Sequence, residues 1–444
     1  MFKSNKSLSW LILLSFLTFL SGCQTLSGLF EPDTDSQRLV FDEPVTPLQA
    51  DIAKHEFTLS PDQTMVGEIA SIETRENDTL SDIARHFGLG YNDITIANEG
   101  IPAWTPRAGS HVLLPLQFIL PDAPHKGIVL NLANMRMFYY PKNESGKVLT
   151  YPVGIGRDGW NTPMGSTSIA VKTENPTWHV PPSIQKEHAD KGQPLPSAVR
   201  SGPDNPLGLY AMRLDIPSYL IHGTNKPYGI GMQVSHGCVQ MYPENIEVLF
   251  KKVAVGTPVR IVHQPYLAAW QDGMLYVEAN QPLEKWTAGK PQLKKQFIKE
   301  LRKIGKQHNA AVDWEKVDRV IERSDGIPTP VLVSTPDIAE LAQQAPQLAH
   351  PDKFYGQPMT ASLKDTDLAV LVATYNNETE AQQLTAMLNH QGPPIPARKI
   401  QAQDSFKVVA GPFKNKKEVK AASNRIRSDF EINKLKEIKG SEIY

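Results

Sequence analysis

The spacing of hydrophobic residues predicts a small β-α-α-β module over residues 72–117. Leu80, Ile83, Ala84 and Phe87 recur at helical spacing, so they share one face of a short helix. A second short helical pattern follows this helix, and the apolar run "GSHVLLP" predicts the closing strand. The segment is therefore predicted to form one small folded unit.

Residues 126–264 change to a strand pattern. The stretch "GIVLNLANMRMFYY" alternates β-branched or aromatic residues with others and is interrupted at "AN", which predicts a hairpin. Further short apolar runs are separated by Gly and Pro, and only "PENIEVLFKKV" has a clear helical period. The pattern predicts a mainly-β domain of the β-sandwich-like kind.

The C-terminal region, residues 367–442, repeats a strand followed by a helix. "LAVLVATYNNETEAQQLTAMLNHQG" and "FKVVAGPFKNKKEVKAASNRIRSDF" both show this order, which predicts an α+β ferredoxin-like module. Residues 265–365 are expected to form an extension and linker. Within them we expect a hairpin in "QDGMLYVEANQPLE", an amphipathic helix from Leu293 to Ile304 and a further helix in "DWEKVDRVIERS".

The N-terminus predicts a targeting segment. Two lysines precede the apolar run Leu8 to Leu20, which is shorter than the roughly 20 residues of a membrane span. "LSGC" follows directly and resembles a bacterial lipobox, which implies a signal peptide over residues 1–22, lipid on Cys23, and a tether over residues 23–71. Gln24 resembles an outer-membrane sorting residue of Gram-negative lipoproteins. A plain signal peptide or an uncleaved anchor remains the alternative.

Composition narrows the possible functions. The 444 residues carry a formal net charge of -1, so no global basic field indicates nucleic-acid binding. The chain has two cysteines. If Cys23 carries lipid, Cys238 has no partner within the chain, and in an oxidising compartment such a thiol is either buried and inert or kept for reactivity.

The stretch "SHGCVQM" surrounds Cys238 with residues that suit a nucleophile. His222 lies 16 residues earlier in "YLIHGTNKP", a separation that lets a loop return one strand end to another. A thiol and an imidazole that meet in this way can perform acyl transfer, with the histidine moving the proton. A zinc site built from His179, His188, His222, His236 and Cys238 is the less favoured alternative, since no tight metal-ligand spacing occurs.

"HGT…SHGCV", the "TPMG" segment and the opening "KGIVLNLANMRMFYY" resemble the L,D-transpeptidase, or YkuD, catalytic domain. The resemblance implies that Cys238 is the nucleophile and His222 the general base and acid, and that the Gly223 carbonyl orients His222. It further implies supporting roles for Ser235 and His236, an oxyanion-hole role for Gly237, and substrate contacts at Gln240, Gly165 and Trp160. Many members carry arginine where this chain has Gln240.

The other two modules also resemble known families. "NDTLSDIA" and "PRAGSHVLLP" resemble the LysM domain, and "VVAGPFKNKKEVKAA" resembles the SPOR domain. These resemblances imply binding to peptidoglycan glycan strands in the periplasm, and the catalytic resemblance implies transfer of a peptidoglycan tetrapeptide stem to an amine without any cofactor. The acceptor would be a second stem, giving a 3-3 cross-link, or a small lipoprotein. A hydrolase acting on the same substrate and a non-catalytic scaffold remain open.

Overall fold

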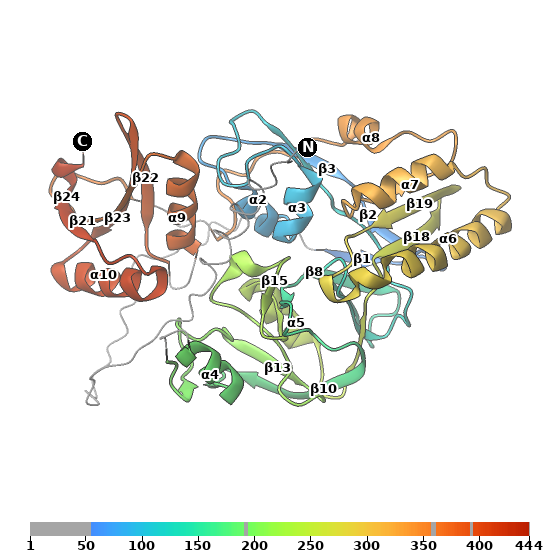
Figure 1. Ribbon diagram of the computed structural model, residues 1–444, viewed down its shortest axis with the longest axis horizontal. Helices are drawn as coiled ribbons and strands as arrows, with labels where there is room; N and C mark the ends of the chain where they lie inside the picture. Colours follow the sequence, from blue (N-terminus) through green and yellow to red (C-terminus); the bar gives the residue numbers. More distant parts are fainter. Residues whose placement is uncertain (1–54, 191–193, 357–360, 391–393, 444) are drawn as a thin grey trace, which may run out of the picture. The chain divides into compact units, whose positions relative to one another are not determined.

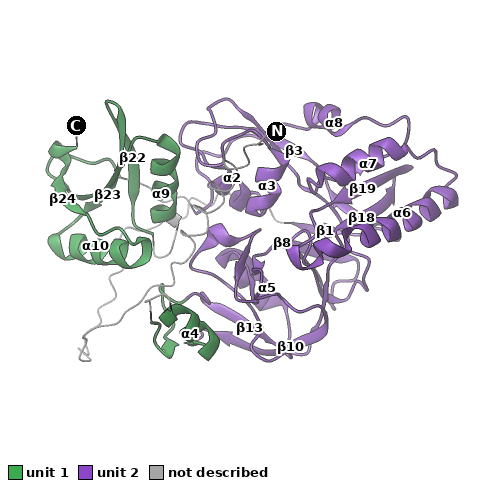
Figure 2. Cartoon of the chain, viewed as in Figure 1, with its two compact units in different colours: residues 1–46, 177–205, 358–444 green, residues 47–176, 206–357 purple. Residues whose placement is uncertain are grey.

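The structure is a computed structural model that describes residues 55–190, 194–356, 361–390 and 394–443. The chain divides into two compact units (Figure 2), which are described separately. One unit comprises residues 47–176 and 206–357, and the other comprises residues 1–46, 177–205 and 358–444. The signal peptide, the lipidated cysteine and most of the tether that the sequence predicts lie outside the described residues. Among the described residues, no helix is both long enough and apolar enough to cross a membrane.

The first unit is built on a nine-stranded sheet with the order β1-β8-β7-β6-β17-β10-β13-β14-β16. Figure 1 labels β1, β8, β10 and β13 of this sheet. β10 joins its two halves, because its first residues pair with β17 and its last residues pair with β13. A register shift between Ile169 and Val171 marks the change of partner. The strands are β1 Glu56–Thr58, β6 Gly127–Asn131, β7 Arg136–Tyr140, β8 Lys147–Pro152, β10 Gly165–Glu174, β13 Tyr210–Leu214, β14 Leu220–His222, β16 Val239–Gln240 and β17 Pro258–Val262.

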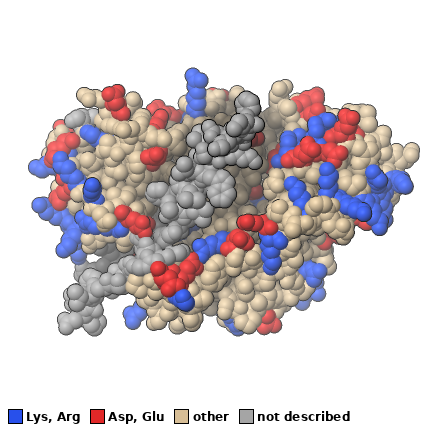
Figure 3. Space-filling view, in the orientation of Figure 1, with Lys and Arg blue, Asp and Glu red and all other residues tan. Residues whose placement is uncertain are grey.

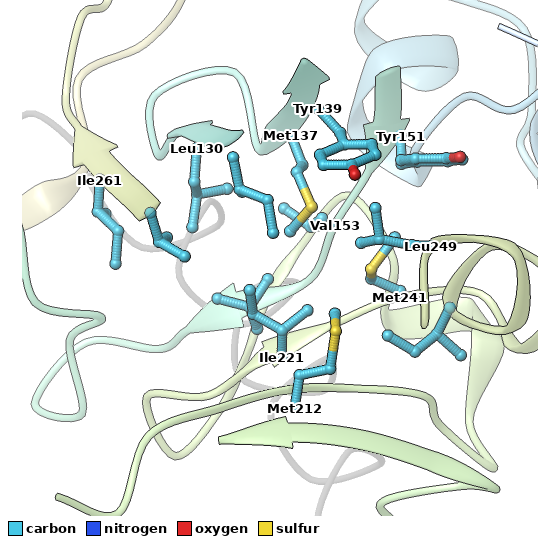
Figure 4. Close-up of a cluster of buried hydrophobic side chains, with 14 of the residues drawn as sticks. Leu130, Met137, Tyr139, Tyr151, Val153, Met212, Ile221, Met241, Leu249 and Ile261 are labelled. Carbon is cyan, nitrogen blue, oxygen red and sulfur yellow. The ribbon is translucent and has the colours of Figure 1, made fainter. Parts of the chain in front are cut away.

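The mainly-β expectation is confirmed, but the β-sandwich-like expectation is corrected. One continuous sheet curls into a half-barrel, and its two halves face the same core (Figure 4). Leu130 and Met137 from one half meet Met212 and Ile221 from the other. Local periodicity identified the strands but could not show this closure, because the turn of β10 depends on pairing partners far apart in the chain. Helix α5, Pro243–Lys252, adds Ile246 and Leu249 to this core.

The predicted β-α-α-β module consists of β3 Ala70–Glu73, α2 Leu80–His86, α3 Tyr91–Ala97 and β4 His111–Leu114. The Thr79 hydroxyl caps α2 by accepting a hydrogen bond from the Asp82 amide at 3.1 Å. The expected helical face, Leu80 to Phe87, is buried.

The tether predicted over residues 23–71 extends too far along the chain, because residues 56–58 and 65–67 form strands. β1 pairs with β8, and β2, Met65–Gly67, pairs with β5, Gln117–Ile119. Met65 and Val66 are 1% and 2% exposed, so burial of these apolar side chains fixes a stretch whose polar composition suggested a linker.

Residues 265–365 fold more extensively than expected. The predicted hairpin is β18 Tyr266–Gln271 with β19 Met274–Ala279, to which β20, Thr329–Pro330, is added. The predicted helices are α6, Lys290–Gln307, and α7, Trp314–Arg323, and they share a core with the hairpin.

The expected linker sequences of this region are also packed. Leu348 donates its amide to Ser71, beside β3, and Phe354 is buried in the core around α2. Helix α8, Ile338–Gln344, precedes them. Remaining short elements of the first unit are β9 Ile155–Gly156, β15 Gln233–Ser235, η1 Pro227–Gly229 and η2 Glu284–Gly289.

The second unit contains the predicted α+β module. Its sheet has the order β22-β23-β21-β24, and α9 and α10 bury apolar residues against it. The elements are β21 Leu368–Tyr375, α9 Glu378–His390, β22 Ala397–Ala402, β23 Ser405–Phe413, α10 Lys416–Phe430, β24 Lys436–Lys439 and η3 Gly440–Glu442. This unit also holds α4 Pro182–Asp190 and the paired strands β11 Trp178–His179 and β12 Ala198–Val199. Figure 3 shows lysine and arginine side chains mixed with acidic ones over this module.

Two ion pairs join the β-α-α-β module to the curled sheet. Arg136 on β7 is fully buried and donates to Asp93 on α3 at 2.9 Å and to the Gly88 carbonyl at 3.3 Å. Arg85 on α2 makes a bidentate pair with Glu244 on α5, with both distances 2.9 Å. These bonds connect segments that are distant in sequence, so the β-α-α-β module packs as part of the first unit.

Loss of the negative charge on Asp93 should destabilise the whole first unit. Asp93→Asn keeps an acceptor for the Gly90 amide but leaves buried Arg136 without its nearest countercharge, which we expect to lower the free energy of unfolding by about 3 kcal/mol. Urea denaturation measures this change. Glu247→Gln, the same chemical change at an exposed pair with Lys251, is the control and should shift stability by under about 0.5 kcal/mol. Equal small shifts in both variants would contradict the linking role of Arg136.

Candidate active site

Parallel pairing of β14 with β16 brings the histidine and cysteine segments together. Ile221 lies opposite Val239 and His222 opposite Gln240, and the Met241 amide donates to the His222 carbonyl at 2.9 Å. Cys238 directly precedes β16, so the ladder brings the backbone segments that carry Cys238 and His222 side by side.

The His222 ring is held in one tautomer. Its Nδ1 donates to the Gly223 carbonyl at 2.6 Å, as expected from the sequence. A carbonyl oxygen only accepts, so a neutral ring carries its proton on Nδ1 and a lone pair on Nε2. Burial lowers the pKa of His222 to about 4, although the carbonyls of Gly223 and Leu207 act in the opposite direction. His222 is therefore an uncharged base at neutral pH.

The Cys238 thiol is also uncharged in this structure. It is half-buried, and its Sγ donates to the Ser218 carbonyl at 3.7 Å. Burial raises the pKa of Cys238 to about 11, outweighing a hydrogen bond to the Leu220 backbone. The thiol and the imidazole are therefore both neutral at pH 7.

A serine hydroxyl fixes the loop that carries the thiol. Ser235 Oγ accepts from the Gly237 amide at 3.1 Å and donates to the Cys238 carbonyl at 2.6 Å. The supporting role expected for Ser235 and the oxyanion-hole role expected for Gly237, whose N–H here donates to Ser235, stay predictions. Gly237 has φ +100°, and a Cβ there would lie 2.8 Å from the Tyr219 ring.

Sequence reasoning named Trp160 but missed Gly156, Arg157 and Thr162 in the turn at 156–162. Thr162 Oγ1 donates to the Gly237 carbonyl at 2.8 Å and accepts from the Gly156 amide at 3.0 Å. The Arg157 amide donates to the Ser235 carbonyl at 3.0 Å. The available sequence signal was the threonine in the glycine-rich stretch "GIGRDGWNTP". In the structure Thr162 is buried, and a buried polar residue needs a hydrogen-bond partner.

His236 and Trp160 lie together beside the thiol loop. Their rings are arranged edge to face with centroids 4.8 Å apart, and the Arg157 guanidinium lies 2.9 Å from His236 Nε2. The structure therefore brings the side chains of Trp160 and Arg157 to His236, on the loop that carries Cys238.

Gln240 and Gly165 occupy different places. The Gln240 backbone exchanges hydrogen bonds of 2.8 and 2.9 Å with Gly154, and its side-chain oxygen lies close to Gly154 and Gly229. Gly165 begins β10 opposite Ile261, and no described hydrogen bond connects it to Cys238 or His222. Gln240 is thus part of the strand next to His222, and the substrate contacts expected at Gln240 and Gly165 stay predictions.

The zinc alternative finds no support in the geometry. In the part of the chain that the structure describes, no three His, Cys, Asp or Glu side chains gather as metal ligands would. His179 and His188 belong to the second unit, whereas His222, His236 and Cys238 belong to the first.

Comparison with known families agrees with this site. Residues 125–261 match the L,D-transpeptidase catalytic domain (YkuD), residues 72–115 match the LysM domain, and residues 364–434 match the SPOR domain. The chain belongs to the L,D-transpeptidase family, whose members act on peptidoglycan, and it is an enzyme of that family. LysM and SPOR domains bind peptidoglycan, which makes this a peptidoglycan-binding protein of the cell envelope.

The alignments with curated relatives cover most of each relative's own length. The chain is 38% identical over 271 residues to the probable L,D-transpeptidase YbiS of Escherichia coli (strain K12), covering 60% of this chain and 87% of that protein. It is 39% identical over 234 residues to the probable L,D-transpeptidase ErfK/SrfK of the same strain, covering 52% and 75%. A solved catalytic domain of the L,D-transpeptidase of E. faecium is 26% identical, covering 32% of this chain and 99% of that domain, with a TM-score of 0.24.

The neutral thiol predicts slow alkylation at neutral pH. In a form beginning at residue 24, Cys238 is the sole cysteine. With a pKa of about 11, its reaction with iodoacetamide at pH 8 should be about 100-fold slower than that of the same protein unfolded in urea, whose thiol has a pKa near ~8.5. The rate should rise about tenfold per pH unit up to pH ~10. An alkylation rate that is already constant between about pH 5 and 7, as for thiols of low pKa, would instead indicate a preformed thiolate–imidazolium pair.

Proposed function

We propose that this protein transfers a peptidoglycan tetrapeptide stem to an amine through a thioester on Cys238. The observation that supports the proposal is the pairing of β14 with β16, which brings the segment of Cys238 next to the strand of His222, whose Nδ1–H donates to the Gly223 carbonyl. In a neutral ring, that bond puts the proton on Nδ1 and leaves Nε2 as the acceptor. In this proposal Cys238 is the nucleophile and His222 the base that acyl transfer requires.

The reaction proceeds in two steps. In the first, the Cys238 thiol gives its proton to His222 Nε2 while sulfur attacks the carbonyl of the diamino acid. The bond to the terminal D-residue then breaks, and His222 returns the proton to the departing amine. In the second step, an acceptor amine loses a proton to His222 and attacks the thioester, which releases the thiol. A stem amine as acceptor gives a 3-3 cross-link, and the lysine of a small lipoprotein gives lipoprotein attachment.

The two peptidoglycan-binding domains support this assignment. The LysM domain is joined to the catalytic sheet by Arg136 and Arg85, so glycan bound there stays close to the thiol. The SPOR domain adds a second attachment to the same polymer through a covalent chain connection. Two attachments raise the local concentration of stems without any change at the catalytic residues.

Mass spectrometry of the intact chain from residue 24 tests the function directly. With a disaccharide-tetrapeptide, we expect a mass gain on Cys238 that equals the stem without its terminal D-amino acid. His222→Gln should slow this acylation about 10²- to 10⁴-fold because the base is lost, and Cys238→Ala should abolish it. His111→Gln, at an exposed histidine of the LysM strand β4, is the matched control and should leave the rate unchanged.

The products distinguish the remaining alternatives. Amine-linked products establish transfer, whereas release of tripeptide alone establishes a hydrolase. A folded protein that binds glycan but forms neither adduct nor product would refute the catalytic proposal in favour of a scaffold.

We further propose that the protein is held by lipid on Cys23 in the periplasm, at the outer membrane of a Gram-negative bacterium. The support is the order of lysines, apolar run and "LSGC" in the sequence. Labelling cells with a clickable fatty acid should mark the wild-type protein and the Cys238→Ala control but not Cys23→Ala. Equal labelling of the Cys23→Ala variant would show that the lipid is not on this cysteine.

A further inference from the structure

We propose that Arg157 determines substrate specificity at this site by binding a carboxylate of the donor stem peptide. The inference rests on the proposed function of Cys238. Arg157 was not among the residues that the sequence motifs singled out, and it enters the site only through the folded turn at 156–162.

The backbone of Arg157 is fixed against the thiol loop. Its amide donates to the Ser235 carbonyl at 3.0 Å, and its carbonyl accepts from the Trp160 amide at 2.9 Å. The preceding residue, Gly156, approaches so closely that a Cβ there would lie 2.9 Å from the Gly237 Cα. The start of the arginine side chain therefore has a defined position next to the residues that flank Cys238.

The guanidinium reaches the residue beside the nucleophile. Its terminal nitrogen lies 2.9 Å from Nε2 of His236, two residues before Cys238. A guanidinium only donates, so His236 Nε2 must accept and the ring must be neutral. The positive charge at this position is consequently that of Arg157 and not that of the histidine.

Arg157 carries a permanent positive charge, whereas His222, Cys238 and Gln240 are neutral. His222 is neutral at pH 7 because burial lowers its pKa to about 4, and Cys238 is neutral because burial raises its pKa to about 11. Gln240, whose side-chain amide carries no charge, packs close to Gly154 and Gly229. A permanently charged, half-exposed guanidinium with a planar set of N–H donors is suited to a carboxylate.

The stem peptide provides the matching group. Its diamino acid, the residue whose carbonyl Cys238 attacks, carries a further carboxylate when it is diaminopimelate. Binding of that carboxylate by Arg157 would place the scissile carbonyl near the thiol and would select against stems in which the carboxylate is amidated. Trp160 packs edge to face on His236, the residue that the Arg157 guanidinium also contacts.

Paired substrates separate this role from a structural one. We would measure kcat/KM for thioester formation by the full chain in mild detergent, with two disaccharide-tetrapeptides that differ only in a carboxylate or a carboxamide on the diamino acid. Arg157→Gln should lower the value for the carboxylate substrate about ten- to hundred-fold, as expected for a lost charge-assisted bond, and change the carboxamide value less than about threefold. Arg157→Lys, which keeps the charge but not the planar donor set, should give an intermediate loss.

Arg260→Gln is the matched control, since Arg260 is an exposed arginine whose guanidinium also makes a side-chain hydrogen bond, to Ser166 at 2.6 Å. It should leave both values unchanged. Equal losses for both substrates in Arg157→Gln would show that Arg157 only supports the thiol loop, and unchanged values would show that it does not contact substrate. Either result overturns the inference. Failure of the wild-type chain to form any thioester would count instead against the proposed function.

Discussion

The short parallel ladder between β14 and β16 is the interaction on which the catalytic arrangement depends. It joins two segments 16 residues apart, with His222 at the end of one strand and Cys238 directly before the other. The strands are only three and two residues long, so neither would be stable alone. Their geometry is maintained because β13 continues the sheet on one side, while Gly154 exchanges backbone bonds with Gln240 on the other.

Around this ladder, the site is kept in place by buried hydrogen bonds and carries little charge. Ser235 closes the thiol loop, Thr162 ties that loop to the turn at 156–162, and the Gly223 carbonyl orients His222. Burial keeps the Cys238 thiol and the His222 ring neutral, which protects the thiol from reactions that need a thiolate.

Two ion pairs attach the LysM domain to the catalytic domain, in addition to the chain connection. Buried Arg136 reaches from β7 to α3, and Arg85 reaches from α2 to α5. Residues 345–356 extend this packing, with His350 bonded to Asp78 at 2.9 Å and Phe354 buried. A glycan-binding module fixed in this way keeps a constant orientation to the thiol, whereas a flexibly tethered module would only keep it nearby.

The sequence by itself determined the three modules and most helices and strands, and its motifs predicted Cys238 and His222 as the candidate thiol and base. These features depend on local periodicity, caps and residues close together in the chain, and such signals are present before folding. Only the tertiary structure decided that the sheet curls into a half-barrel, that residues 55–71 belong to it and its neighbours, and that Arg157 and Thr162 join the site. Each of these depends on partners tens of residues away, such as Thr162 with Gly237 or Arg136 with Asp93. Their pairing is set by the burial of apolar surface and of polar groups that must find partners, and no local pattern along the chain records it.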